Sequence, residues 1–141
     1  MEIRRAQAED FAFLSQHDAH IAPDELEAQI ERGRVLIAQE GGRRIGWLRW
    51  NLFWDNTPFL NLLFLLEGFR QKGYGRQLMQ EWERRMAAQG FRLVMTSTLS
   101  SEQAQHFYRA LGYRDAGSLL LEGEPLEIFF TKRLDVPEKK G

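Results

Sequence analysis

A short stretch of glycines and basic residues is the part of this sequence best suited to binding an anion. It reads Arg70-Gln71-Lys72-Gly73-Tyr74-Gly75-Arg76. Glycine permits backbone angles that other residues avoid, so consecutive N–H groups can converge on one point. The amphipathic helix expected to follow adds unpaired N–H donors and the positive end of its dipole. The stretch therefore predicts a phosphate cradle, although a glycine turn before a helix with a solvated basic face fits the same residues.

Charge and glycine spacing limit the classes of ligand that the cradle could bind. Six basic and two acidic residues lie between positions 70 and 92, whereas the whole chain has a formal net charge of −1. Because the positive charge is local, the composition provides no global attraction to nucleic acid or to an anionic membrane. The glycines follow neither the G-x-G-x-x-G nor the G-x-x-x-x-G-K-[ST] pattern, which disfavours a Rossmann dinucleotide site and a P-loop.

A second informative segment lies further along the chain. It reads Ala104-Gln105-His106-Phe107-Tyr108-Arg109-Ala110-Leu111-Gly112-Tyr113. Its apolar residues recur at helical spacing, with Tyr108 on the apolar face and His106 off it. Ser100 followed by Gln103 has the pattern of a capping box, and Gly112 is a helix stop. The segment therefore predicts a helix that presents Tyr108 to the interior.

Together the two segments resemble the GNAT superfamily of N-acetyltransferases. The acetyl-CoA pyrophosphate loop of that family reads [RQ]-x-x-G-x-[GA], and Arg70, Gly73 and Gly75 occupy its three defined positions. The second family motif reads A-x-x-F-Y-x-x-x-G-[FY], which residues 104–113 match at every defined position. The predicted order of elements agrees as well, and the resemblance covers about residues 2–134. We therefore expect a single domain over residues 1–134 and a solvated tail at 135–141.

The resemblance implies a fold and an acyl donor. The fold is mixed α/β (α+β), with a mostly antiparallel central sheet, helices on both faces and a splayed cofactor site between the fourth and fifth strands. The donor is acetyl-CoA, whose pantetheine arm pairs with the fourth strand as an added strand. The residues expected to contact it are Leu63, Phe64, Leu65, Arg70, Gln71, Lys72, Gly73, Tyr74, Gly75, Arg76 and Ser101.

The resemblance also implies a role for Tyr108, because the tyrosine at this position in the family protonates the leaving thiolate. The ordinary pKa values of a thiol, ~8.5, and of a phenol, ~10, are compatible with that role. A core aromatic is the alternative interpretation, and the two are compatible, since a buried phenol still needs a partner for its hydroxyl. Glu67 is a candidate base for the acceptor ammonium, beside Asp55 or water alone, and no spacing argument selects among them.

The sequence also departs from the family pattern. Many members have proline where Glu67 stands and asparagine where Ser101 stands, and a serine side chain has a shorter reach. Some relatives use a glutamate on the fourth strand as base, whereas residues 59–66 contain no carboxylate and Asn61 is their one polar side chain. These departures keep a second interpretation open, namely a non-catalytic CoA-binding or acyl-CoA-binding sensor or regulatory module with the same fold.

The elements that must position these residues follow from periodicity and stop signals. Two short helices are expected first, one beginning near Glu9 and one running from Pro23 to Gly33. A strand is expected at the start of the chain, before the first helix. Further strands are expected at 35–38, 45–54, 59–66, 91–98, 118–121 and 126–134, and a helix is expected after Gly75 as far as Gly90. Within 45–54, Trp50 and Trp54 are predicted to face the core.

Composition limits the chemistry and the location. The 141 residues include no cysteine, which excludes a disulfide framework, a thiolate metal site and a cysteinyl acyl-enzyme. Direct attack of the acceptor in a ternary complex is therefore expected. His17 and His20, with Asp18 and Asp24 nearby, are a pair of histidines without a third ligand at a recognisable spacing. We therefore expect no metal site. No apolar run approaches the ~20 residues of a membrane span, and no signal peptide is recognisable, so we expect a cytoplasmic protein.

The acceptor is predicted to be a small or peptidyl primary amine with an apolar body. Aromatic residues of the 45–54 strand, with Asp18, Asp24 and Asp55, suit such a cation. The face of this strand that carries Trp47, Arg49, Asn51 and Phe53 is expected to border the acceptor. Neither nucleic acid nor membrane is an expected partner. A homodimer is compatible with the sequence, which carries no signal for oligomeric state, for the identity of the amine or for acyl groups other than acetyl.

Overall fold

The strands in the described part of the chain form one seven-stranded sheet in the order β1-β2-β3-β4-β5-β7-β6. The structure is a computed structural model that describes residues 1–135. The pairs β1–β2, β2–β3, β5–β7 and β6–β7 are antiparallel, and β4–β5 is parallel. The predicted mixed α/β fold with a mostly antiparallel sheet is therefore confirmed. The predicted tail falls largely outside the described residues.

The chain divides into two compact units. The first comprises Met1–Asn51 and Leu62–Glu81, and the second comprises Leu52–Asn61 and the residues from Trp82 onward. Three elements contribute residues to both units: β3 (Arg43–Phe53), β4 (Thr57–Leu65) and α3 (Tyr74–Ala88). The single domain expected over residues 1–134 stays a prediction.

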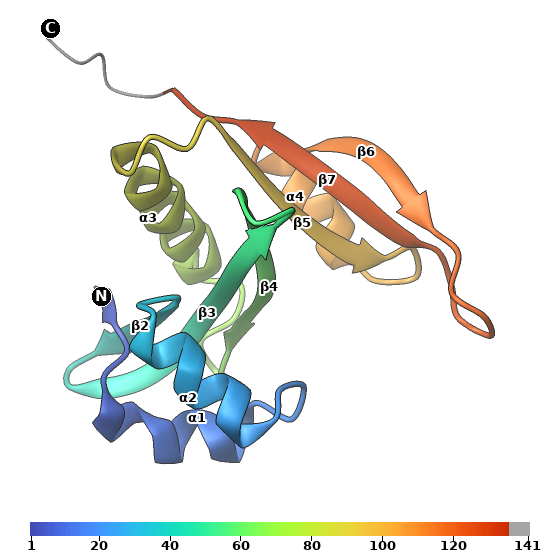
Figure 1. The fold of residues 1–141 in the computed structure, drawn as a ribbon. Helices are drawn as coiled ribbons and strands as arrows, with labels where there is room; N and C mark the ends of the chain where they lie inside the picture. Colours follow the sequence, from blue (N-terminus) through green and yellow to red (C-terminus); the bar gives the residue numbers. More distant parts are fainter. Residues whose placement is uncertain (136–141) are drawn as a thin grey trace, which may run out of the picture. The chain divides into compact units, whose positions relative to one another are not determined.

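The first unit begins with β1 (Glu2–Arg5), the 3-10 helix η1 (Ala8–Asp10), α1 (Phe11–His17), α2 (Pro23–Glu31) and β2 (Val35–Glu40). The helices α1 and α2 pack against each other, as the blue ribbons in Figure 1 show. Pro23 begins α2 and Gly33, with a φ of 73°, follows its end, as predicted. Leu14, Leu26 and Trp47 are fully buried in one core cluster of this unit.

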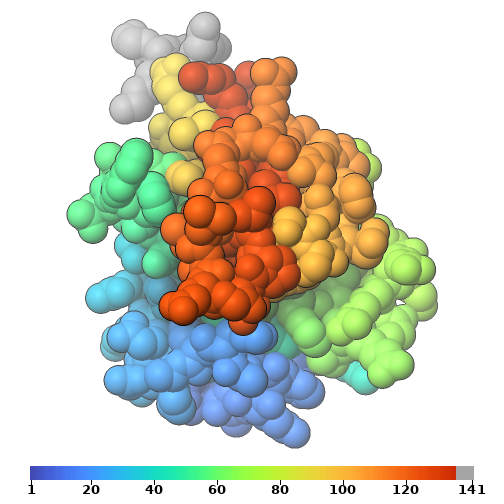
Figure 2. Space-filling view, turned by 90° about the vertical axis from the view of Figure 1, so that its right-hand side faces the viewer, coloured from blue at the N-terminus to red at the C-terminus, as the bar shows by residue number. Residues whose placement is uncertain are grey.

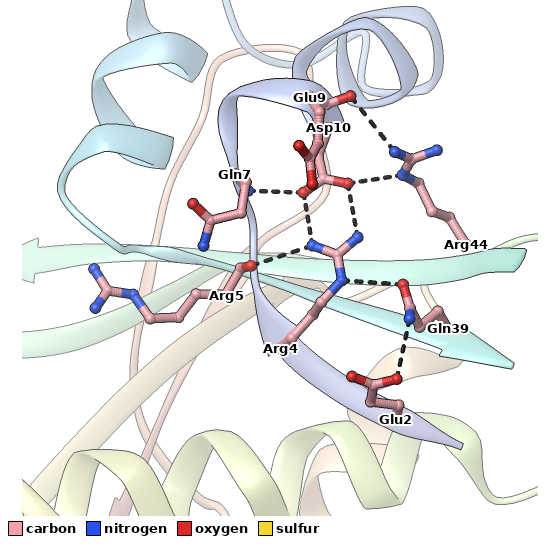
Figure 3. A network of polar contacts seen from close by, with 8 residues as sticks. All are labelled: Glu2, Arg4, Arg5, Gln7, Glu9, Asp10, Gln39 and Arg44. Atoms are coloured by element: carbon pink, nitrogen blue, oxygen red, sulfur yellow. Dashed lines mark hydrogen bonds and ion pairs between the residues drawn. The ribbon is translucent and has the colours of Figure 1, made fainter. Parts of the chain in front are cut away.

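A buried carboxylate connects the start of the first unit to its sheet (Figure 3). Asp10 accepts two hydrogen bonds from the Arg4 guanidinium, at 2.8 and 2.9 Å, and one from Arg44 Nε at 2.7 Å. The Gln7 backbone N–H donates a fourth at 2.7 Å. The hydrogen bonds from Arg4 are the largest cause that holds the pKa of Asp10 below its ordinary value, against the opposing effect of burial. Asp10 therefore stabilises the packing of β1 and η1 on β3.

The second unit is built on β5 (Leu93–Leu99), which pairs with β7 (Glu127–Arg133), and β7 pairs with β6 (Arg114–Leu119). The first part of β4 joins β5 through Phe59–Met95 and Leu60–Thr96. The helix α4 (Ala104–Ala110) packs against β5, as the orange helix in Figure 1 shows. The apolar residues predicted for the buried face of α3 are buried in both units: Leu78 and Met79 in the first, Trp82 and Met86 in the second.

Three local predictions for the second unit are wrong. The capping box does not form, because α4 begins at Ala104 with Gln103 as N-cap and no side-chain cap bond. Trp54 is 80% exposed rather than in the core, since it has a φ of 54° in the turn after β3. The strand predicted at 118–121 is β6, which starts at Arg114. Its residues are all exposed, so no apolar alternation revealed it.

An exposed apolar hairpin tip follows β6. Figure 2 shows the orange segment of β6 and the following residues at the surface of the second unit. Leu119 and Leu121 are about half exposed and Leu120 is 83% exposed. The bounds 118–121 predicted for this strand were placed over these leucines, because an apolar run on a sheet edge resembles a buried strand in sequence.

Candidate functional site

The predicted phosphate cradle lies in the first unit, between β4 and the first turn of α3. Gly73 has a φ of 84°, and a Cβ built on it meets no atom within 4 Å. The Gly73 carbonyl accepts the first helical hydrogen bond from the Gln77 N–H at 3.1 Å. The N–H groups of residues 74–76 precede that bond and therefore have no acceptor within the helix. Open space above a glycine beside three such donors fits an anionic group.

Two basic side chains of the cradle are available to an anion. Lys72 and Arg76 are exposed, and neither forms an ion pair with any residue in the described range 1–135. Lys72 Nζ lies 6.0 Å from the centroid of the Phe69 ring. Gln71 is exposed as well, with a φ of 60°, and Gly75 is buried in the first turn of α3.

Arg70 and Tyr74 are held by protein groups instead. Arg70 Nε donates to the Leu65 carbonyl at 3.0 Å, and its guanidinium carbon lies 5.0 Å from the Phe64 ring centroid. The Tyr74 hydroxyl donates to Glu40 Oε2 at 2.6 Å, and this bond raises the pKa of Tyr74. The side chain of Tyr74 therefore anchors the start of α3 to the end of β2, and its backbone N–H is the group left for a ligand.

Neighbouring residues already contact the backbone at the end of β4. Leu63, Phe64 and Leu65 are half-buried, and the Leu65 carbonyl already accepts from Arg70. A Cβ on Gly46 would lie 2.6 Å from the Phe64 carbonyl oxygen, so only glycine lets β3 approach β4 so closely here. Pairing of a pantetheine arm with these three residues stays a prediction. Glu67 lies exposed in the turn after β4, where it stays a candidate base.

Tyr108 lies in the second unit, on the face of α4 that packs against β5. Its side chain is enclosed, with 7% exposure, and its ring lies 5.7 Å from that of Tyr113 and 6.2 Å from that of Phe130. Burial raises the pKa of Tyr108 to about 12, although a hydrogen bond with the Thr96 hydroxyl acts in the opposite direction. The phenol is therefore protonated at neutral pH.

Thr96 completes a chain of hydroxyl groups that the sequence did not reveal. Its Oγ1 donates to the Leu60 carbonyl at 3.1 Å. The same Thr96 hydroxyl interacts with the Tyr108 hydroxyl, and this interaction opposes the rise in the pKa of Tyr108. The Tyr108 hydroxyl therefore lies against β5. A polar residue within an apolar strand was the available signal, but it does not name the partner.

A buried carboxylate network orients the end of α4. Glu83 Oε2 accepts from the Tyr113 hydroxyl at 2.8 Å, and Glu83 Oε1 pairs with Lys132 Nζ at 2.7 Å. Burial, followed by the nearby Glu83 charge, raises the pKa of Tyr113. The Tyr113 N–H donates to the Tyr108 carbonyl at 3.1 Å. The network is not evident from the sequence, where its one signal is a carboxylate four residues after Met79 on the apolar face of α3.

Ser101 is exposed in the turn before α4, and Asn61 is exposed on β4. Gln105 Nε2, rather than a serine side chain, stabilises that turn by donating to the carbonyls of Ser100 and Glu102 at 2.8 and 2.9 Å. Ser101 as a contact of the cofactor stays a prediction.

The residues expected around the acceptor are more buried than predicted. Trp47 is fully buried, and its Nε1 donates to Asp18 Oδ2 at 3.3 Å. Arg49 is also buried and donates from Nε to the same oxygen at 2.8 Å. The expectation that this face of β3 borders the acceptor is therefore wrong for Trp47 and Arg49, because both side chains are buried against Asp18. For the half-buried Asn51 and Phe53 it stays a prediction. The His20 N–H also donates to Asp18, at 3.2 Å, which holds the α1–α2 loop.

His17 packs against aromatic rings rather than beside His20. Its ring centroid is 4.6 Å from that of Phe13 and 6.2 Å from that of Trp47. Within the described range, no three His, Asp or Glu side chains are grouped so that they could hold a metal ion. A cavity of about 710 Å³ in the first unit, lined by residues of β1, η1, α1 and α2 such as Phe11 and Ile30, contains none of the predicted site residues.

Comparison with known proteins gives a family match over most of the chain. Residues 1–113 match the acetyltransferase (GNAT) family. No curated protein matches the sequence. None of the described helices has the length and apolar character needed to cross a membrane.

Several solved structures share the fold. A GNAT-family acetyltransferase from Bacillus cereus is 22% identical, with a TM-score of 0.77, and the match covers 94% of this chain and 96% of that one. The ribosomal-protein-S18-alanine N-acetyltransferase of Escherichia coli is 13% identical, with a TM-score of 0.79 and coverage of 99% and 97%. A GNAT-family acetyltransferase from Elizabethkingia anophelis with acetyl-CoA bound is 16% identical, with a TM-score of 0.74 and coverage of 94% and 97%.

Proposed function

Because the chain belongs to the acetyltransferase (GNAT) family, we propose that it transfers the acetyl group of acetyl-CoA to a primary amine by direct attack in a ternary complex. The observation that carries the proposal is the cradle at Gly73, where open space adjoins three helix N–H donors and the exposed cations of Lys72 and Arg76. Direct attack is favoured because the chain has no cysteine to carry the acyl group.

The donor would be held mainly by backbone groups. The N–H groups of residues 74–76 would bind the pyrophosphate, while Lys72 and Arg76 would add charge. Because Arg70 is already bonded to the Leu65 carbonyl, its side chain would hold the loop of the cradle in place rather than bind the ligand. When bound, acetyl-CoA would supply an activated acyl thioester. A bound donor in the Elizabethkingia anophelis structure supports the same donor here.

Tyr108 would act on the leaving sulfur as a general acid. A phenol whose pKa is about 12 is a reluctant acid toward a thiolate of pKa ~8.5, since full transfer costs about 5 kcal/mol. Tyr108 would therefore first donate a hydrogen bond to the developing charge. Thr96 could then turn its proton from the Leu60 carbonyl to the Tyr108 oxygen, which would stabilise that oxygen as its own proton leaves.

The proposed acceptor is a small or peptidyl amine with an apolar body. The Escherichia coli relative, by its name, acts on an alanine of a ribosomal protein, which supports a peptidyl amine. Arg49 is paired with Asp18, so it supplies no free charge for an acceptor carboxylate. The base stays open between Glu67, Asp55 and water. A cytoplasmic location and a homodimer stay predictions.

Amine-dependent release of free thiol from acetyl-CoA tests the proposal. Purified protein is incubated with acetyl-CoA and a panel of amines, and binding of acetyl-CoA is measured separately by titration calorimetry. The proposal expects both binding and thiol release that depends on the amine. Binding without release for any amine in the panel would instead support the non-catalytic sensor, and absence of binding would remove both interpretations.

A further inference from the structure

The second unit contains a buried hydroxyl that its own fold does not use. Thr98 is 5% exposed, and its Oγ1 has no hydrogen-bond partner within the described residues. Leaving a buried hydroxyl without a partner costs roughly 1–3 kcal/mol of stability, so such groups are rare in folded proteins. Valine has nearly the same shape and would avoid this cost at a β-strand position. The Thr98 hydroxyl is therefore expected to find a hydrogen-bond partner from outside the chain.

The position of Thr98 indicates where that partner lies. Side chains alternate along β5, and Val94, Thr96 and Thr98 form its buried set. Thr96 on this face contacts the Tyr108 hydroxyl of α4, so Thr98 lies on the same face, ~7 Å further along the strand. The parallel pairing of β5 with β4 involves Met95 and Thr96, and Thr98 comes after it.

The neighbouring hydroxyl does not need the same partner. Thr96 Oγ1 is satisfied by Leu60 and Tyr108, although it is just as buried, at 1% exposure. The two threonines thus differ in one respect, because one is bonded within the protein and the other is not. The unmet group of Thr98 is a donor and acceptor of the kind that fits an amide or ester carbonyl.

We propose that the Thr98 hydroxyl binds the acyl donor by donating a hydrogen bond to a carbonyl oxygen of its thioester or its pantetheine arm. This inference rests on the proposed function, since it names a further donor contact in the same reaction. Thr98 then acts as a binding residue that aligns the donor along β5, beside the hydroxyl pair of Thr96 and Tyr108. The free energy that the unpaired Thr98 hydroxyl costs in the free protein is recovered when the donor is bound.

The test compares binding and stability of Thr98→Val with wild type. Removing an unpaired buried hydroxyl should leave the melting temperature unchanged or raise it, while the dissociation constant for the donor should rise about three- to tenfold. Thr96→Val is the matched control, because it deletes a bonded hydroxyl on the same face and should lower the melting temperature. Thr98→Ser and Thr98→Ala form a second pair, equal in size apart from the hydroxyl, of which only the serine variant should retain affinity.

Calorimetry with two ligands identifies the carbonyl. If Thr98→Val weakens acetyl-CoA but not CoA, the hydroxyl binds the thioester, and if it weakens both equally, it binds the pantetheine arm. Affinities for both ligands within twofold of wild type would overturn the inference and would mean that the hydroxyl is satisfied by water. Wild-type protein that binds neither ligand would overturn the proposed function itself, which makes the two failures distinguishable.

Discussion

Replacing Tyr108 by phenylalanine deletes one hydroxyl from a buried ring and leaves its packing intact. The hydroxyl bonds Thr96, which keeps its own bond to the Leu60 carbonyl at 3.1 Å in the variant. No protein group therefore loses its last partner, and the loss in the free energy of unfolding should be about 1 kcal/mol or less. For a chain of this size that corresponds to a fall in melting temperature of ~4 °C at most.

Loss of a general acid has a much larger effect on the reaction. Turnover should fall by ~10²–10⁴-fold, which corresponds to about 3–5 kcal/mol on the barrier. Affinity for acetyl-CoA should change little, because the phenol acts in the transition state. Turnover within threefold of wild type in the folded Tyr108→Phe protein would refute the catalytic role and leave Tyr108 as a core aromatic.

Tyr113→Phe provides a matched control. It makes the same change to the neighbouring ring, whose hydroxyl bonds Glu83 at 2.8 Å. Glu83 keeps Lys132 but loses a donor, so stability should fall by about 1–3 kcal/mol while turnover stays near wild type. Opposite rankings of the two variants in a melt and in a thiol-release assay would therefore separate catalysis from packing.

The pH dependence of wild-type turnover tests the same assignment. The pKa of Tyr108 is raised to about 12, so the phenol stays protonated across the range in which enzymes are assayed. Turnover should rise with pH as the acceptor amine loses its proton, at a pKa of ~10.4 for an alkylamine or ~8 for a peptide α-amine, and it should show no alkaline decline from Tyr108 below about pH 11. A decline near pH 9 that disappears in Tyr108→Phe would contradict the raised pKa.

Three further predictions concern the cradle, the fold and the acceptor. Gly73→Val should abolish measurable acetyl-CoA binding in calorimetry with an unchanged circular dichroism spectrum, because a φ of 84° is strained for valine and its side chain fills the cradle. Asp10→Asn should lower the free energy of unfolding at pH 7 by about 3 kcal/mol, since it leaves the partly buried guanidinium groups of Arg4 and Arg44 without their carboxylate. Because the folded pKa of Asp10 is depressed, the stabilisation that its carboxylate provides is complete above the unfolded pKa of ~3.9 and is lost as pH falls below that value. The free energies of unfolding of wild type and variant, measured by urea denaturation, should therefore converge at low pH. In an amine panel, thiol release should favour apolar amines or short peptides, and activity confined to phosphorylated or nucleotide acceptors would contradict the proposed acceptor.

The elements of this protein were largely readable from local spacing. Gly33, Gly90 and Gly112 mark helix ends at positive φ, and the apolar positions of α3 are buried as predicted. Helix periodicity and glycine stops depend on residues that are close in sequence, so they predict the elements without knowledge of the tertiary contacts. The β6 strand was misplaced because an exposed edge carries no alternation of apolar and polar residues.

The partners of polar side chains were decided by tertiary structure alone. Asp18 draws Arg49 and Trp47 inward from β3, a strand more than twenty residues away, and turns an expected acceptor wall into core. Spacing in sequence likewise cannot tell that Thr96 is bonded and Thr98 is not, since both occupy the same face of one strand. A side chain's type limits which hydrogen bonds it can make, whereas the fold decides which groups come within reach of it. The sequence thus determined the family and the position of the glycines and the tyrosine for which a role is proposed, and the fold determined which charges are neutralised and which hydroxyl stays unpaired.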